Sequence, residues 1–226
     1  MPVERNSINL FSDIKTMGFY RYIFEKEQPD YVLSYTIKPI VWAGIALRWS
    51  PNARFTALIT GLGYAFQGQS FVRKVLRWIV SKLYTFSLKR ADRVIFQNSD
   101  NLNYFVHNGF VSKSKTHIVN GSGVNTEYYN VTKLPEGHVN FLCVSRLLGE
   151  KGLREYATAS KIVKIKFPEV TFDLVGPTDS SPDAISLEEV TSWSDYLKYN
   201  GATNDVRPFI EKCHVFVLPS YHEGLP

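Results

Sequence analysis

Short apolar runs alternate along the chain with segments of helical hydrophobic spacing. Seven runs have the length and composition of strands, several of them apolar enough for burial on both faces: residues 31–36, 55–60, 93–98, 116–120, 139–145, 170–176 and 213–220. Between them a helical period covers residues 9–27, 39–49, 71–90, 99–107, 151–166 and 204–212. A strand, a crossover helix and a further strand imply a parallel sheet, so the pattern predicts an α/β fold.

A polar stretch, residues 120–138, interrupts this pattern after four predicted strands and before three more. We therefore expect two doubly wound, Rossmann-like domains: residues 1–122 and residues 139–226, joined by a linker over 123–138. In such folds the ligand binds at the carboxyl ends of the strands, in the cleft between domains. Glycines at these ends allow backbone N–H groups to approach a ligand, although most such glycines only make turns: Gly61, Gly63, Gly121, Gly123, Gly176 and Gly224.

Residues 71–90 read as a basic amphipathic helix. Helical spacing places seven apolar residues on one side: Phe71, Val72, Val75, Leu76, Ile79, Leu83 and Phe86. The opposite arc carries three cations: Arg73, Lys74 and Arg77. Two interpretations stay open, a helix packed on the sheet with a solvated basic face, or a helix that also meets an anionic membrane surface through this face and Trp78.

Composition narrows the class of protein. The chain has 226 residues, 44% of them hydrophobic, which suffices for one large domain or two modest ones. The sequence indicates neither a membrane-spanning run nor a signal peptide. Its net charge of +5 favours an anionic partner. Cys143 and Cys213 lie in apolar segments and are expected to be reduced, and the five histidines lack metal-ligand spacing.

The strongest local constellation is SRLLGEKGL, residues 145–153, which follows a predicted strand and opens a predicted helix. It presents Arg146 and Lys151, with Gly149 and Gly152, near a helix N-terminus. Two cations, backbone N–H donors and the helix dipole favour a clamp for a diphosphate group, because they stabilise negative charge where it develops. An ordinary solvated loop with basic residues is the alternative.

A carboxylate stands at the end of a different strand. Glu223 follows the apolar run at 215–218, beside Gly224 and Leu225. It could accept hydrogen bonds from ligand hydroxyls while the amides of Gly224 and Leu225 face an anion. The alternative is a plain exposed turn.

Taken together, SRLLGEKGL, DLVG (173–176) and PSYHEGLP (219–226) resemble the retaining GT-B glycosyltransferases of family 4. That family carries an R-x4-K clamp, matched by Arg146 and Lys151, and an E-x7-E motif beginning EG(L/F)P, whose first glutamate matches Glu223. In the amino half four segments resemble the subgroup that extends bacterial lipid-linked glycans, such as N,N'-diacetylbacillosaminyl-diphospho-undecaprenol N-acetylgalactosaminyltransferases: 35–39, 59–66, 91–98 and 119–129.

The resemblance implies two GT-B domains facing across a cleft. It implies retaining transfer of a hexose or N-acetylhexosamine from a nucleotide sugar, with UDP the expected nucleotide, to a lipid-linked glycan at the inner face of the cytoplasmic membrane. Arg146 and Lys151 would neutralise the leaving diphosphate, and Glu223 with the Gly224 and Leu225 amides would hold the sugar. Gly149, Gly176 and Gly123 would line the donor side, and Gly61, Gly63 and Tyr64 the acceptor side. No metal or other cofactor is implied.

The resemblance also implies that both domains are incomplete. The second glutamate of E-x7-E would fall beyond Pro226, and the family's first strands would precede Met1. We therefore expect a truncated chain with low solubility, through an exposed sheet edge, and with weak turnover. Other interpretations stay open: a non-catalytic remnant or membrane-associated subunit, or another enzyme of this architecture such as a UDP-sugar epimerase or a sugar phosphorylase. Nucleic-acid binding is disfavoured, because the basic residues do not alternate with exposed aromatics across a strand face.

Overall fold

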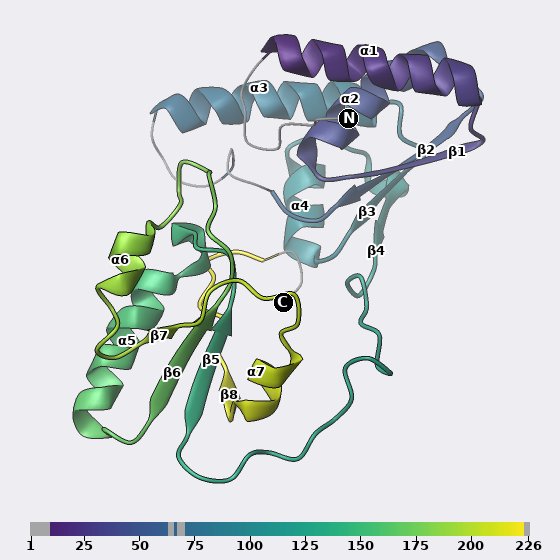
Figure 1. Ribbon diagram of the computed structural model, residues 1–226. Coiled ribbons are helices and arrows are strands. Elements are labelled where there is room, and N and C mark those ends of the chain that lie inside the picture. The colour runs from purple at the N-terminus through teal and green to yellow at the C-terminus, as the bar shows by residue number, and fades with distance from the viewer. Residues whose placement is uncertain (1–9, 63–65, 67–70, 224–226) are drawn as a thin grey trace. The chain divides into compact units, whose positions relative to one another are not determined.

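The computed structural model describes residues 10–62, 66 and 71–223. The chain divides into two compact units, which we call the amino unit, up to residue 123, and the carboxyl unit, from residue 124. Each unit is built on its own four-stranded parallel sheet (Figure 1). The predicted α/β class with two parallel-sheet domains is therefore confirmed.

The sheet of the amino unit runs in the order β1-β2-β3-β4, which is also the order of the sequence. Its strands are β1 (Tyr31–Tyr35), β2 (Arg54–Ile59), β3 (Arg93–Phe96) and β4 (Thr116–Ile118). The helices are α1 (Leu10–Glu27), α2 (Ile37–Ala46), α3 (Phe71–Leu88) and α4 (Ser99–His107), with short 3₁₀ turns at η1 (Leu47–Trp49) and η3 (Lys113–Lys115). Because parallel crossovers are right-handed and always step the same way here, α2, α3 and α4 cover one face of the sheet.

Alternation along the strands produces the core of this unit. In β2 the side chains of Phe55, Ala57 and Ile59 are buried, and the residues between them are not. Tyr84 of α3 and Phe105 of α4 close over them, within a cluster of edge-to-face aromatic rings. Helix α1 packs outside α2 (Figure 1). The helix-facing side of the sheet is thus sealed.

One arginine holds the end of α3 against the loop before β2. Arg90 donates to the backbone carbonyls of Pro51 (2.9 Å) and Ala53 (2.5 Å). Ser87 adds a buried bond to the Ile40 carbonyl of α2, 2.7 Å long. These contacts fix which stripe of α3 faces inward.

The sheet of the carboxyl unit runs β7-β6-β5-β8. Its strands are β5 (Asn140–Val144), β6 (Thr171–Val175), β7 (Lys198–Tyr199) and β8 (Val215–Phe216). Its helices are η4 (Gly149–Lys151), α5 (Leu153–Lys166), α6 (Leu187–Thr191) and α7 (Arg207–Lys212). One face packs on α5 and α6 and the other on α7 (Figure 1). Cys143 and Cys213 are buried free thiols, as expected, and burial raises the pKa of Cys143 to about 12.

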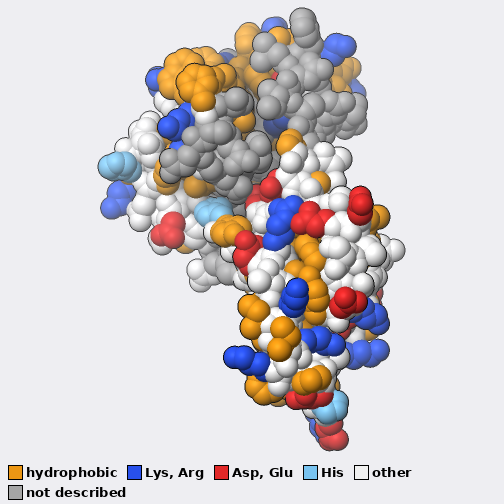
Figure 2. Space-filling model, turned by 90° about the vertical axis from the view of Figure 1, so that its left-hand side faces the viewer, with side chains coloured by type: hydrophobic (Ala, Val, Ile, Leu, Met, Phe, Trp, Pro, Cys, Tyr) orange, Lys and Arg blue, Asp and Glu red, His pale blue; other side chains and the backbone are white. Residues whose placement is uncertain are grey.

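The surface over α5 and α6 carries charges of both signs. Figure 2 shows basic and acidic side chains interspersed over the lower part of the molecule, where these helices lie. Arg154 of α5 pairs with Glu189 of α6 at 2.6 and 2.9 Å. A surface with charges of both signs is typical of a solvated helix, whereas the segment of α3 carries positive charges only.

All seven predicted strands form, but the hydrophobic pattern did not predict two short elements, β7 and α6. The two residues of β7 are too few for any alternation, and α6 is a single turn of helix whose start is capped by Ser186. The predicted helix over 204–212 begins only at Arg207, with Pro208 in its first turn. Short elements of this kind depend on neighbours far away in the sequence.

The predicted orientation of α3 was wrong in part. Phe71, Val75, Ile79 and Phe86, expected on the packed side, have exposed fractions of 80%, 43%, 43% and 45%. The inward stripe instead contains Tyr84, Ser87 and Leu88, because their bonds and ring contacts to α2 and α4 set the rotation of the helix.

In the part of the chain that the structure describes, no helix combines the length and apolarity needed to cross a bilayer.

Two helical glycines test the packing of the amino unit. A Cβ at Gly44 of α2 would meet the Ser87 hydroxyl and, at 2.8 Å, the Phe55 ring, whereas a Cβ at exposed Gly18 of α1 would meet nothing within 4 Å. We expect Gly44→Ala to lower the free energy of unfolding by about 1 to 3 kcal/mol through overpacking. Gly18→Ala should raise it by up to about 1 kcal/mol through helix propensity. Urea unfolding followed by circular dichroism measures both, and equal effects would contradict this packing.

Candidate functional site

The carboxyl ends of β5, β6 and β8 lie at one edge of the carboxyl unit's sheet. Strand β5 pairs in parallel with β6 on one side and with β8 on the other. The three segments that leave these ends therefore meet at that edge: residues 145–152, 176–186 and 217–223. These segments carry most of the residues predicted for the site.

The loop after β5 is bonded to the segment after β6. The Leu147 amide donates to the Pro177 carbonyl at 3.0 Å, and the Gly149 amide donates to the Asp183 carbonyl at 2.9 Å. The carboxylate of Asp183 also accepts from the Glu150 amide at 2.6 Å. The backbone donors around Gly149, which we expected to face a ligand, are thus used within the protein.

Gly152 brings the segment after β8 against the same loop. Its φ of +67° is left-handed, and a Cβ there would collide with the Pro219 carbonyl. The Tyr221 amide donates to the Glu150 carbonyl at 3.1 Å, and the Tyr221 hydroxyl bonds to Glu155. This close approach carries Glu223 to the start of α5.

Lys151 and Glu223 form an ion pair at the centre of this contact. The Lys151 ammonium lies 2.6 Å from a Glu223 oxygen, and their side chains are 18% and 26% exposed. Burial alone would raise the pKa of Glu223, but hydrogen bonds from Lys151 and Ser220 and the positive charge beside it lower the pKa overall. Glu223 is therefore an anion that already accepts from Lys151.

Arg146 also faces a carboxylate. Its Nη1 lies 2.5 Å from Asp179 Oδ2, and the side chains are 36% and 10% exposed. The other oxygen of Asp179 accepts from the Ser181 amide at 2.8 Å. Hydrogen bonding to Ser181, together with Arg146, lowers the pKa of Asp179 to about 2. Both cations that were predicted to form a clamp thus lie at this edge of the sheet, each beside an acid.

Other predicted site residues lie in varied places. Gly176 follows β6, and a Cβ there would collide with the carbonyl of Ser145, the residue before Arg146. Gly123 and Gly61 belong to the amino unit, where a Cβ on either would meet nothing within 4 Å. Four further residues lie outside the described part of the chain: Gly63, Tyr64, Gly224 and Leu225. The structure thus brings Arg146, Lys151, Gly149, Gly176 and Glu223 to one edge of one sheet.

Sequence reasoning missed the acids that organise this edge. Asp179 and Asp183 lie in the turn-rich segment after β6, with Ser and Pro around them. The one sequence signal for them was their position after the carboxyl end of a predicted strand. His222, the residue before Glu223, has its Nε2 buried, and no described residue bonds to that atom.

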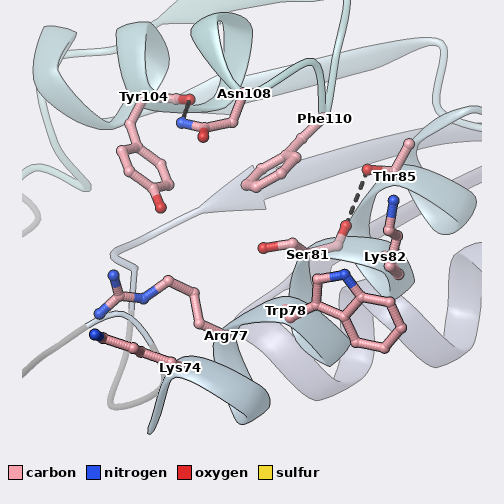
Figure 3. Close-up of a pocket in the computed structure, with 9 residues that line it drawn as sticks. All are labelled: Lys74, Arg77, Trp78, Ser81, Lys82, Thr85, Tyr104, Asn108 and Phe110. Carbon is pink, nitrogen blue, oxygen red and sulfur yellow. Dashed lines mark hydrogen bonds between the residues drawn. The ribbon is translucent and has the colours of Figure 1, made fainter. Parts of the chain in front are cut away.

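The amino unit carries a separate pocket of about 360 Å³ between α3 and α4. Figure 3 shows Lys82 next to the indole of Trp78, Lys74 and Arg77 pointing away from that ring, and the Tyr104 and Phe110 rings opposite. Trp78 is 64% exposed. Arg77 also donates to the Phe66 carbonyl at 3.1 Å. The pocket therefore combines positive charge with exposed aromatic surface.

Two family models match the chain, and between them they leave out only residues 99–137. One describes "Glycosyl transferases group 1" and covers residues 138–226; the other describes "Glycosyl transferase 4-like" and covers residues 1–98. The chain belongs to the GT-B glycosyltransferases. The resemblance predicted from Arg146, Lys151 and Glu223 is therefore confirmed at the level of the family.

Curated members of this family that resemble the chain are bacterial. An N,N'-diacetylbacillosaminyl-diphospho-undecaprenol α-1,3-N-acetylgalactosaminyltransferase of Campylobacter jejuni is 28% identical over 99% of the chain. A UDP-Gal:α-D-GlcNAc-diphosphoundecaprenol α-1,3-galactosyltransferase of Escherichia coli is 22% identical over the whole chain. The chain spans 61% of the length of each. The chain is thus related to transferases named for lipid-linked acceptors.

Solved GT-B structures share the fold. Sucrose-phosphate synthase of Thermosynechococcus elongatus superimposes with a TM-score of 0.76 at 19% identity, over 100% of this chain and 58% of that one. The lipopolysaccharide outer core galactosyltransferase WaaB gives a TM-score of 0.58 at 17% identity, over 97% and 58% of the two chains. At such identities the likeness supports the two-domain fold.

A glycine pair in the carboxyl unit tests the close approach of the site loops. Gly152 and Gly201 both have φ near +70°, at +67° and +76°, but only a Cβ at Gly152 would meet another atom. We expect Gly201→Ala to cost about 1 to 2 kcal/mol through backbone strain. Gly152→Ala should cost about 3 kcal/mol or more, because strain and overpacking add. Urea unfolding measures both free energies, and a Gly152→Ala cost no larger than that of Gly201→Ala would count against the contact with Pro219.

Proposed function

We propose that the chain performs the donor chemistry of a retaining glycosyltransferase of surface polysaccharide biosynthesis. The donor is a nucleotide sugar, with UDP carrying a hexose or N-acetylhexosamine, and the acceptor is a hydroxyl of a lipid-linked glycan. The observation that carries the proposal is one loop, residues 146–151, which places two cations before α5 and joins Glu223 through Lys151. Relatives named for diphospho-undecaprenol acceptors, one of them for UDP-Gal as well, support the substrate classes.

In this proposal the two cations bind the donor's diphosphate. Arg146 offers several N–H groups in one plane, and Lys151 offers a compact positive charge. The first turn of α5 adds N–H groups that have no acceptor inside the helix. Negative charge grows on the diphosphate as the sugar departs, so cations fixed beside it stabilise the transition state more than the ground state. Glu223, with the amides of Gly224 and Leu225, would hold the sugar hydroxyls.

The transfer needs no covalent intermediate on the protein. The bond between the anomeric carbon and the diphosphate oxygen breaks, and its electron pair stays on the diphosphate. The acceptor oxygen forms the new bond on the same face of the sugar, and its proton passes to a diphosphate oxygen. Since Arg146 and Lys151 supply the positive charge, we propose a reaction without a resident metal. The coupling constant of the product's anomeric proton tests retention.

Division of labour between the units is part of the proposal. The carboxyl unit, residues 139–226, would bind the donor, residues 123–138 would link the units, and the amino unit would bind the acceptor. Helix α3 supports an acceptor at a membrane. It holds exposed Phe71, Val75 and Trp78 beside Lys74 and Lys82, and the segment 71–90 contains no acidic residue. A helix of this kind lies on anionic lipid, here the inner face of the cytoplasmic membrane.

Calorimetric titration with UDP tests the diphosphate clamp. We expect saturable binding by the parent chain and at least about a hundredfold weaker binding by the double variant Arg146→Gln, Lys151→Gln, because hydrogen bonds to charged groups contribute about 1.5 to 3 kcal/mol each. UDP-N-acetylgalactosamine and GDP-mannose titrated in parallel report the preference for nucleotide.

The matched control is Lys164→Gln, Lys166→Gln. It removes the same charge from the other end of α5 and should leave UDP binding unchanged. If both double variants weaken UDP binding equally, the attraction is a general effect of charge, and the clamp is wrong. If the folded parent chain does not bind UDP, the proposed donor site is wrong.

Vesicle flotation tests the membrane surface. We expect the parent chain to float with phosphatidylglycerol vesicles and not with phosphatidylcholine vesicles. Lys74→Gln, Lys82→Gln should weaken binding about thirtyfold, since each cation near an anionic surface contributes about 1 kcal/mol. The Lys164→Gln, Lys166→Gln chain again serves as the control of equal charge. Equal flotation of the two variants would refute a specific role for α3.

A further inference from the structure

Asp179 stands beside Arg146 and has no role in the function proposed so far. It is not a chance surface neighbour, because its side chain is only 10% exposed and its two oxygens have different partners. Oδ2 lies 2.5 Å from Arg146 Nη1, and Oδ1 accepts from the Ser181 amide at 2.8 Å. The carboxylate is thus fixed from one side and presented to the guanidinium from the other.

Backbone contacts set the distance between these two residues. The pairing of β5 with β6 continues past both strands, with Ser145 N–H donating to the Val175 carbonyl at 2.9 Å and Leu147 N–H to the Pro177 carbonyl at 3.0 Å. Gly176 lies so close to the Ser145 carbonyl that a Cβ would not fit. Arg146 and the start of the Asp179 turn are therefore held side by side by the main chain.

Asp179 leaves most of the guanidinium available. An arginine has five N–H groups, and only one bond, from Nη1, goes to Asp179. No described residue accepts from the others, and the Arg146 side chain is 36% exposed. The Ser181 amide and Arg146 keep the pKa of Asp179 at about 2, so the carboxylate is charged at any working pH. A permanent anion thus fixes one corner of a cation whose remaining donors are bonded to no described residue.

We propose that Asp179 is a positioning residue for the diphosphate group of the donor: it holds Arg146 by Nη1, so that the remaining N–H groups are aimed at the diphosphate before it arrives. The inference rests on the proposed function. A flexible arginine must lose rotamer freedom to bind a phosphate, and an arginine already held by a partly buried carboxylate loses less. Glu223 differs, because it is itself proposed to touch the sugar, whereas Asp179 acts only through Arg146.

If Asp179 instead competed with the diphosphate for Arg146, its substitution would change UDP binding in the opposite direction. If Asp179 merely occupied Arg146 in the absence of donor, the diphosphate would have to displace it, and removing its charge would tighten UDP binding. The bond to Ser181 speaks against displacement, because that amide keeps the carboxylate where it is. The two roles therefore predict changes of opposite sign for one substitution.

The test compares UDP with uridine, which lacks the diphosphate, by calorimetry on the full chain. Asp179→Asn keeps an oxygen for the Ser181 amide and removes the charge that holds Arg146. We expect it to weaken UDP binding about tenfold, as the loss of an outer partner does for a bound ion, and to leave uridine binding unchanged. In an Arg146→Gln chain the same substitution should add no further loss.

Glu189→Gln is the matched control. It removes the carboxylate of the Arg154–Glu189 pair in the same unit, with the same change of charge, and should leave both affinities unchanged. Unchanged or tighter UDP binding by Asp179→Asn would overturn the positioning role, and an equal loss for UDP and uridine would show a structural one. A folded parent chain that fails to bind UDP would overturn the proposed function and this inference with it, whereas binding by the parent with no effect of Asp179→Asn would overturn this inference alone.

Discussion

The site depends on the parallel pairing of β5 with β6 on one side and β8 on the other. Parallel neighbours end at the same edge of a sheet, so residues far apart in the sequence arrive together there. Arg146 follows β5 by two positions, Asp179 follows β6 by four, and Glu223 follows β8 by seven. If β8 slipped by one residue its side chains would exchange faces, and Glu223 would leave Lys151. The charge arrangement is thus a consequence of strand register.

Glycine enforces that register where the loops meet. Gly152 and Gly176 each press against a carbonyl, of Pro219 and of Ser145, at distances that no side chain would permit. One contact joins the β8 segment to the start of α5, and the other joins the β6 segment to Arg146. Because the backbone segments approach this closely, nearby side chains can meet. Lys151 thus reaches Glu223, and Arg146 reaches Asp179.

Each of the two cations at this edge is paired with an acid, Lys151 with Glu223 and Arg146 with Asp179. Lys151 is 18% exposed, and a cation so far removed from water is costly unless a nearby anion compensates it. The compensation differs between the two cations. Glu223 holds Lys151 from the segment that would also touch the sugar, so donor binding would rearrange that pair. Asp179 is anchored to the Ser181 amide instead, so the Arg146 pair persists. In the proposed donor site, one cation would therefore stay fixed and the other would change partner when the donor binds.

A feature of the site could be predicted from the sequence where the residues that form it lie close together in the chain. Arg146 and Lys151 lie within one short loop, so their spacing and the strand before them already indicated an anion site. Asp179 and Asp183 could not be assigned, because their roles arise from hydrogen bonds between two loops more than 30 positions apart. The rotation of α3 could not be predicted, for a similar reason. Its period showed two faces, but Ser87 and Tyr84, through contacts to other helices, decided which stripe turns inward.

Helices α3 and α5 differ in the charges that surround their exposed apolar residues. Both helices are amphipathic and both have exposed apolar residues, among them Trp78 on α3 and Ile165 on α5. On α5 Glu155 lies among the four cations, and Arg154 is paired with Glu189, which reduces the attraction of that helix for an anionic surface. The segment of α3 has cations and no acid at all. Of these two helices only α3 combines exposed apolar residues and cations with no acid in its segment, and this combination, rather than the overall charge of +5, is what an anionic lipid surface would recognise.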